Sequence, residues 1–261
     1  MSSVMATIFA TTTDNAVPAI TTWPRLCSHC RDYALLMPSR ASSARPPKPK
    51  EPLAPKLPTP LIPAGLPALE DDGMYRSLEF TGTDMASLRA DAFDFEGCRF
   101  TDARLSGMEM RRAGFSDVEM RRCDLSNLAA GTSVMQRTRV SDSRLTGMSW
   151  SECVFRDVVF DACRMDLAGF RFSTFKNVVF RDCTMLEANF QNADLRGTRF
   201  ERCELTGAQF SNARMEGARF ADCALLRISG VTSLKGATIT SRDAQGLVYG
   251  LAGAMGITIE D

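Results

Sequence analysis

The sequence predicts an all-β solenoid: a four-sided β-helix, closed by a C-terminal α-helix and preceded by a disordered tail. Three observations predict this fold class. Apolar residues recur at every fifth position, residues 20 positions apart are of the same kind, and all twelve prolines precede the repeats. Helices and flat strands have periods of 3.6 and 2, so a fixed period of five indicates a solenoid instead.

Residues 1–73 are predicted to be a disordered tail and linker. Residues 1–43 are rich in Ala, Ser and Thr, and residues 44–67 contain most of the prolines, which disfavour both helices and strand ladders. Three interpretations of residues 1–43 remain open: an organellar transit peptide, a disordered tail, or a start codon assigned too far upstream. No charged segment followed by an apolar one is present, so we expect a cytoplasmic protein.

A Cys-x-x-Cys motif lies in this tail. Cys27 and Cys30 enclose His29, the single histidine of the chain. A structural zinc site needs four ligands held by a small fold, and no second pair of cysteines lies nearby in the sequence. We therefore predict no metal and no cofactor, with a zinc or redox role for this motif as the alternative. A single histidine also excludes mechanisms that need two imidazoles.

The period of five runs without a break through the second part of the chain. Counting in fives from Phe80 to Leu225 gives thirty positions, and every one is apolar; we call each the centre of a pentad. The residue two positions before a centre is small or apolar almost throughout, and seven of the nine cysteines occupy that position. Both positions are predicted to point inward, so these cysteines are interpreted as compact buried hydrophobes rather than metal ligands or disulfides.

A period of 20 sets the number of sides. The centres divide into an aromatic series that includes Phe160, Phe180 and Phe200, and an aliphatic series that includes Met165, Met185 and Leu205. Four pentads therefore make one coil, and residues 74–230 make about 7.5 coils at the ~4.8 Å spacing of adjacent strands. Residues 128–140 fit the repeat least, because Ala130 is a small centre and Ser133 and Thr138 fill inward positions, and we expect a local bulge or loop there.

The pentads carry a resemblance to a known family. Residues 188–192, 193–197 and 208–212 read ANFQN, ADLRG and AQFSN. They resemble the pentapeptide-repeat family, whose unit is A(D/N)LXX, and the resemblance covers about residues 78–228. It implies a right-handed quadrilateral β-helix. The strong preference for Arg over Lys fits a bacterial genome of high GC content.

The resemblance also implies candidate functions. Some members of the family bind DNA gyrase by imitating the shape and charge of duplex DNA, and they protect the enzyme from quinolones or peptide toxins. The segment 231–261 is similar to the helical cap of actinobacterial members. Gyrase protection is therefore one hypothesis for this chain.

The segment 231–261 is predicted to cap the last coil with a helix at about 241–255. Asp243 is expected at its N-terminus, where a carboxylate accepts backbone hydrogen bonds, and Gly256 is expected to end it. One face of this helix carries the apolar residues Leu247, Val248, Leu251 and Met255. A cap prevents end-to-end pairing of the final coil. The alternative is a helix that caps the coil and also forms a homodimer with its twin.

The distribution of charge disfavours nucleic-acid partners. Residues 78–227 contain 21 basic and 22 acidic residues, spread over all four sides. A DNA mimic of this length would carry on the order of 20 excess negative charges, and a DNA-binding protein would carry a basic stripe. Gyrase protection is thus the disfavoured hypothesis. No apolar run approaches the roughly 18 residues of a membrane span, so we expect neither nucleic acid nor a membrane as partner.

One outward-facing patch departs from this polar surface. The residue just before a centre is usually polar, yet four of these residues are valines on two neighbouring sides. The predicted patch consists of Val134, Val154, Val159, Thr174 and Val179, flanked by Arg156, Lys176, Asp161 and Arg181. An apolar centre with a charged rim is typical of a protein-binding site. The alternative is that β-branched residues here only favour strand geometry.

These observations together predict a non-enzymatic β-helical scaffold that binds a protein partner through its outer surface. No nucleophile elbow, phosphate-binding loop or zinc-protease motif is present in the sequence, and acidic residues occur singly. The partner cannot be named from the residues. Gyrase protection is the second hypothesis and an enzyme is the third.

Overall fold

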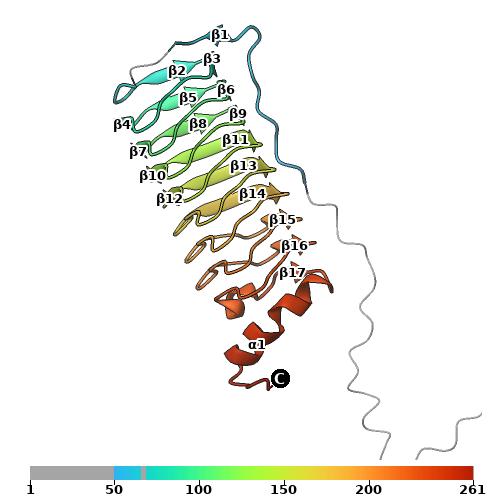
Figure 1. Ribbon diagram of the computed structural model, residues 1–261. Helices are drawn as coiled ribbons and strands as arrows, with labels where there is room; N and C mark the ends of the chain where they lie inside the picture. Colours follow the sequence, from blue (N-terminus) through green and yellow to red (C-terminus); the bar gives the residue numbers. More distant parts are fainter. Residues whose placement is uncertain (1–49, 66–68, 261) are drawn as a thin grey trace, which may run out of the picture. The chain divides into compact units, whose positions relative to one another are not determined.

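The computed structural model describes residues 50–65 and 69–260, which belong to one compact unit. They form a parallel β-solenoid of about nine turns, so the predicted fold class is confirmed (Figure 1). The number of turns is larger than predicted, because one strand before the repeats and one after them extend the ladder. The motif of Cys27, His29 and Cys30 lies outside the described residues.

Within the described residues, one face of the solenoid is a parallel ladder of ten strands. Strands within the repeats pair residues that occupy the same position in successive coils, as in Phe180 with Phe200. In ladder order the strands are β1 (Ile62–Pro63), β3 (Leu78–Thr81), β6 (Arg99–Thr101), β9 (Glu119–Arg121), β11 (Val134–Ser141), β13 (Val154–Asp161), β14 (Thr174–Arg181), β15 (Arg199–Glu201), β16 (Arg219–Ala221) and β17 (Thr238–Ile239). The predicted stacking of every fourth pentad is therefore confirmed.

The other faces keep the same register over shorter stretches. One contains β2 (Met74–Arg76), β5 (Asp94–Glu96) and β8 (Gly114–Ser116), and β8 pairs with the first half of β11. Another is a separate sheet of β4 (Arg89–Asp91), β7 (Glu109–Arg111), β10 (Ala129–Gly131) and β12 (Ser149–Ser151). The sides of the coils that have no named strand are joined by single parallel bridges, such as Asp84 with Arg104.

The corners show how a pentad makes one side of a coil. The residue two positions after a centre adopts a positive φ at most corners, including Asp102 at 52° and Asn127 at 54°. This left-handed conformation costs about 1–2 kcal/mol for a residue other than glycine. The cost is offset because each corner N–H joins the coil ladder, as Asp102 does with the carbonyl of Arg121 at 3.0 Å.

The inward positions fill a closed interior. The rings of Phe160, Phe180 and Phe200 stack almost parallel, with centroids 5.0 and 5.1 Å apart. The seven cysteines in the described part of the chain are buried, as the packing interpretation predicts. Burial of one such aromatic side chain contributes about 1.5–3 kcal/mol. The packing of inward side chains therefore stabilises the solenoid, and the residues at outward positions are free to vary.

The prediction of a bulge or loop at residues 128–140 is wrong. Strand β11 keeps its register there, with Met135 paired with Phe115 in the preceding coil. Ser133 does point inward, and its hydroxyl accepts a hydrogen bond from the N–H of Ala113 at 3.0 Å. An inward hydroxyl can bond to the backbone of the neighbouring coil, so the polar residue needs no break in the repeat.

Residues 50–60, which we call the strap, were predicted to be part of a disordered linker. They run beside β14, β13, β11 and the strands that precede them, and then lead into β1 (Figure 1). The Ile62 N–H donates to the carbonyl of Ser77 at 2.8 Å, which pairs β1 with the first coil. The predicted boundary near Met74 is therefore corrected: residues 50–65 belong to the same compact unit as the repeats.

The C-terminal segment also differs from its prediction. After the repeats come η2 (Val231–Leu234), β17, η3 (Asp243–Leu247) and α1 (Val248–Ala254). The α-helix thus begins at Val248 rather than near residue 241. Asp243 does not cap it, because its Oδ2 accepts the N–H of Cys223 in the last coil at 2.9 Å. The carboxylate therefore attaches the segment to the repeats instead of starting a helix.

Candidate protein-binding faces

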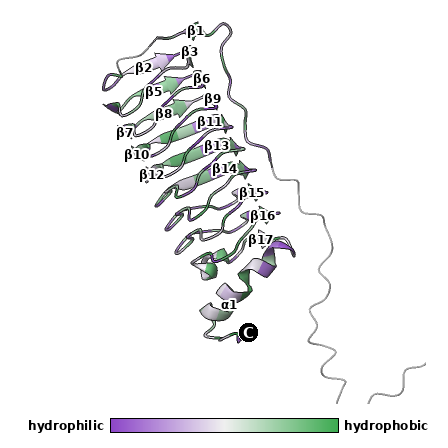
Figure 2. Cartoon of the chain, in the orientation of Figure 1, coloured by the Kyte–Doolittle hydropathy of each residue, from purple (hydrophilic) through white to green (hydrophobic). Residues whose placement is uncertain are grey.

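The structure divides the predicted valine patch into two parts. Val159 and Val179 are 5% and 0% exposed, although both side chains lie on the outside of the coil. Val134 is 43% exposed, and Val154 is half-buried. Figure 2 shows hydrophobic colour along β11 and β13. The patch is therefore not one open surface, and the prediction is wrong for its second pair of valines.

The remaining members of the patch are all in place on the two strands. Thr174 is half-buried at the start of β14, and Arg156 and Lys176 are exposed beside it. Their positions follow the predicted register, with Arg156 paired with Lys176. The first half of the patch, around Val134, stays accessible.

The strap covers the buried pair of valines. Its Leu53 N–H donates to Asp157 Oδ1 at 3.2 Å, and Asn177 Nδ2 donates to the carbonyl of Glu51 at 3.4 Å. These bonds place Pro52, which is buried, over the coils that carry the valines. Sequence analysis missed this cover because the pentad pattern describes only what repeats, and the strap lies outside the repeat.

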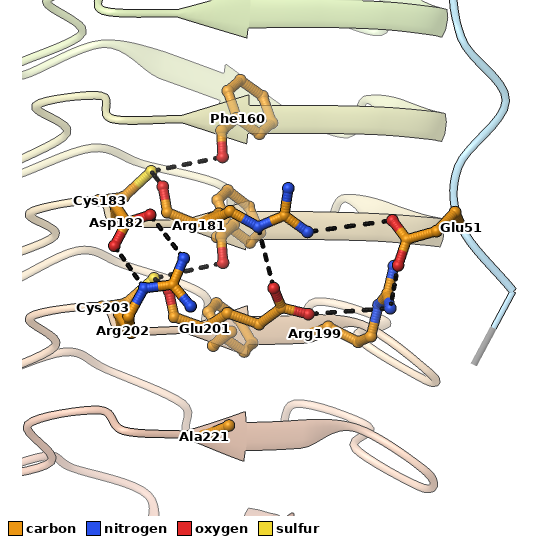
Figure 3. A network of polar contacts seen from close by, with 12 residues as sticks. Glu51, Phe160, Arg181, Asp182, Cys183, Arg199, Glu201, Arg202, Cys203 and Ala221 are labelled. Atoms are coloured by element: carbon orange, nitrogen blue, oxygen red, sulfur yellow. Dashed lines mark hydrogen bonds and ion pairs between the residues drawn. The ribbon is translucent and has the colours of Figure 1, made fainter. Parts of the chain in front are cut away.

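A charged cluster anchors the start of the strap (Figure 3). Glu51 Oε1 accepts a hydrogen bond from Arg199 Nη1 at 2.8 Å, and Arg181 lies 4.0 Å from its other oxygen. Arg181 also donates to Glu201 at 3.0 Å. The hydrogen bond from Arg199 holds the pKa of the Glu51 carboxyl below its ordinary value. The ionised carboxylate is thus the form that the cluster binds.

The other end of the strap rests on a different corner of the solenoid. The Lys56 N–H donates to Asp117 Oδ1 at 2.9 Å. Gly97 lies so close to the Pro58 ring that a Cβ at residue 97 would meet its Cδ at 2.9 Å. A cleft of about 310 Å³ remains between this part of the strap and the solenoid. The strap is therefore held at separate points and is not packed along its whole length.

A second candidate face is an open groove of about 580 Å³ over β4, β7, β10 and β12. Its lining includes Ala90 and Ala130, two small residues at centre positions that are bulky in most other coils. Its rim is charged, with Arg89 and Glu109 paired at 2.9 Å. The small centres were visible in the sequence as departures from the repeat, yet they did not by themselves indicate a groove.

Charges elsewhere on the solenoid pair between adjacent coils. Arg122 and Asp102, Arg202 and Asp182, and Arg137 and Asp117 occupy equivalent corners of successive coils and are in contact at 2.6–2.7 Å. Such corners thus carry opposite signs from one coil to the next. This alternation gives a mixed surface rather than an acidic or a basic face.

The inward cysteines show no feature of a reactive site. Burial raises the pKa of the Cys123 and Cys153 thiols to about 11, so both are protonated at neutral pH. Their sulfurs donate to backbone carbonyls, as Cys153 does to Ser151 at 3.2 Å. Among the described residues, no group of three or more Cys, His, Asp or Glu side chains could hold a metal ion.

The predicted apolar face of the C-terminal helix is mostly uncovered. Leu247 is buried, but Val248, Leu251 and Met255 are exposed, Met255 to 75%. The helix instead approaches the coil through Gly250, where a Cβ would lie 2.9 Å from Val231. Within the described part of the chain, no helix has the length and apolar character that crossing a membrane requires.

Comparison with known proteins identifies the repeats. A model described as a pentapeptide repeat region matches residues 133–210, and one described as pentapeptide repeats in eight copies matches residues 94–127. No curated protein sequence matches the chain.

Solved structures show weak similarity to the chain. Trypsin-treated QnrB1, a plasmid-mediated fluoroquinolone resistance protein, is 19% identical over 72% of this chain and 100% of its own, with a TM-score of 0.37. HetL from the cyanobacterium Nostoc, a pentapeptide repeat protein involved in heterocyst differentiation regulation, is 15% identical over 60% of this chain and 89% of its own, with a TM-score of 0.28. With coils of four pentads in register and two repeat models matched, residues 94–127 and 133–210 of this chain are repeats of the pentapeptide-repeat family.

Proposed function

We propose that the protein is a non-enzymatic β-helical scaffold that binds protein partners through its outer surface. The observation that carries this proposal is the exposed apolar surface at the C-terminal end. It includes Val248, Tyr249, Leu251, Met255, Ile257 and Ile259, each at least 41% exposed. Exposed large apolar side chains gathered in one segment are typical of sites of protein association.

The first partner that we propose is a second copy of the chain, joined through the C-terminal helix. Alpha-helix α1 has only seven residues and buries none of them against its own solenoid. A two-fold pairing would bring Leu251 and Met255 of both copies together and remove their side chains from water. A short helix that is marginal alone gains most from such packing.

Self-association of the full chain tests this proposal. We expect a dimer in sedimentation equilibrium at about 10 μM, a concentration at which mass action favours association. The double variant Leu251→Asp with Met255→Asp should be a monomer. The matched control, Leu167→Asp with Leu186→Asp, changes two exposed leucines on the solenoid and should remain a dimer. A parent chain that stays monomeric at ten times that concentration would contradict the proposal.

The proposal includes a cytoplasmic, bacterial setting and no cofactor. Seven buried thiols, none of them in a disulfide within the described residues, suit a reducing compartment. The alternating charges of adjacent coils support a protein partner over nucleic acid, which needs a surface of one sign. Gyrase protection would require an acidic face, and no observation on the described surface favours it.

A further inference from the structure

We propose that the face of the solenoid under the strap is a binding groove for an extended, proline-rich segment that begins with a carboxylate side chain. The strap is the intramolecular ligand of this groove, and a partner protein that carries a segment of the same chemistry binds by displacing it. The inference rests on the proposed scaffold function for its choice of a protein as ligand. The groove is distinct from the C-terminal surface.

The prolines of the strap follow the period of a polyproline II helix. Pro52, Pro55 and Pro58 recur at every third position, and this helix has three residues per turn. Pro52 is buried, Pro55 is half-buried, and Pro58 lies against Gly97. The three prolines therefore lie on the edge that faces the solenoid, and their burial decreases from Pro52 to Pro58, which is exposed.

The proline period of the strap matches the spacing of the coils in the solenoid. The N–H groups of Leu53 and Lys56, which are also one proline period apart, donate to Asp157 and Asp117. Three residues of polyproline II rise about 9.3 Å, and two coils of the solenoid rise about 9.6 Å. The corner carboxylates of every second coil thus match the free N–H groups between prolines. This match sets a ligand pattern of Glu-Pro-x-x-Pro-x-x-Pro.

The groove has a buried anchor for the carboxylate. The Arg199 side chain is only 7% exposed, and Glu51 bonds to its Nη1 at 2.8 Å. Its Nη2 is buried and has no hydrogen-bond partner in the described residues. A buried guanidinium donor without a partner is costly, and a carboxylate placed on both nitrogens would remove that cost. The strap therefore uses only part of the site.

The strap fills the groove incompletely, so a partner segment can replace it. The strap contacts the solenoid at Glu51, Leu53, Lys56 and Pro58, and a cleft remains beside Lys56, Leu57 and Pro58 at its last part. Its tether gives it the advantage of an intramolecular ligand. A partner segment overcomes this advantage by bonding both nitrogens of Arg199.

The test uses the full chain and a fluorescent peptide with the sequence of residues 49–60. The strap is released by Glu51→Lys with Pro52→Asp, which places a positive charge beside Arg181 and Arg199 and a carboxylate at a buried apolar position. Tryptic cleavage after Lys56 reports the release. Fluorescence anisotropy then measures binding of the peptide, of its Glu51→Gln form, and of a peptide of equal composition in which the prolines no longer recur at every third position.

We expect the released chain to bind the parent peptide at least tenfold more tightly than the rearranged peptide, and at least tenfold more tightly than the unaltered chain does. Adding Arg199→Gln to the released chain should reduce its preference for the Glu peptide over the Gln peptide to less than twofold. The proposal is overturned if the released chain binds both proline arrangements equally, or if the two strap substitutions leave the Lys56 site protected. Either failure leaves the self-association of the C-terminal surface untouched.

Discussion

The two segments that flank the repeats use their side chains in opposite ways. The strap is rich in proline and short of large hydrophobics, yet it buries Pro52 and covers Val159 and Val179. The C-terminal segment is rich in large hydrophobics, yet it leaves Met255 and its neighbours in solvent. Hydrophobicity alone therefore does not decide which flank packs. The flanks also differ in spacing, because three residues of the strap rise about 9.3 Å and two coils of the solenoid rise about 9.6 Å.

The two flanks are also attached differently. The strap is held by contacts spread over several coils, from Arg199 to Asp117 and on to β1. The C-terminal segment continues the solenoid itself, since β17 pairs with β16 and Asp243 accepts the N–H of Cys223. The strap should thus detach while the repeats stay folded. Detachment of the C-terminal segment should instead expose and unfold the last coil.

The largest effect is expected from a charge in the interior of the repeats, because both flanks pack on the folded repeats. Phe180→Asp places a carboxylate between Phe160 and Phe200, where no cation is available, and the cost should exceed 5 kcal/mol, roughly the whole stability of a domain. We expect loss of the β-type circular dichroism signal. Leu167→Asp, on the exposed side of a coil, is the control and should melt like the parent. A folded Phe180→Asp variant would show that the interior is assigned incorrectly.

An intermediate effect is expected under the strap. Val159→Lys with Val179→Lys puts two charges beneath Pro52 and should lower the free energy of strap opening by about 3 kcal/mol, from about 1.5 for each valine. Tryptic cleavage after Lys56 should then become about 100-fold faster, with the repeats still folded.

The matched control for that pair is Val134→Lys with Val154→Lys. It makes the same change in the part of the valine patch that the strap leaves accessible. Cleavage after Lys56 should change by less than about threefold. Equal acceleration by both pairs would mean that the strap does not distinguish the two halves of the patch.

The smallest effect is expected at the C-terminal attachment. Asp243→Ala leaves the buried N–H of Cys223 without an acceptor and should cost about 1–3 kcal/mol, seen as a lower melting temperature. Asp243→Ser should recover much of the loss, because Ser143 and Ser173 accept the equivalent N–H groups at 3.0 Å in other coils. If Ala and Ser melt alike, the hydrogen bond is not what attaches this segment.

The repeats were predictable because each coil obeys the same rule as its neighbours. The inward positions of Phe180 and Cys183 follow from spacing alone, and thirty centres in one register leave no other arrangement. Ser133 shows the limit of that rule: its polarity suggested a bulge, but its hydroxyl finds a backbone partner in the adjacent coil. The pentad pattern carries no information about such partners.

The candidate sites were predictable only in part. The valines were placed correctly on the outside of the coil, but a repeat pattern cannot show that another segment covers Val159 and Val179. The signal for that cover was the period of Pro52, Pro55 and Pro58, which matters only once the coil spacing is known. Asp243 was identified as a hydrogen-bond acceptor, and its partner proved to be the last coil rather than a helix.

The central claim is that the strap docks in a defined register on the solenoid. Amide hydrogen exchange at Leu53 and Lys56 in the full chain tests it most directly, because those two N–H groups bond to Asp157 and Asp117. We predict exchange at least tenfold slower than in the free peptide of residues 49–60, with Asp157→Ala removing the protection of Leu53. Exchange at the rate of the free peptide at both positions would contradict the account.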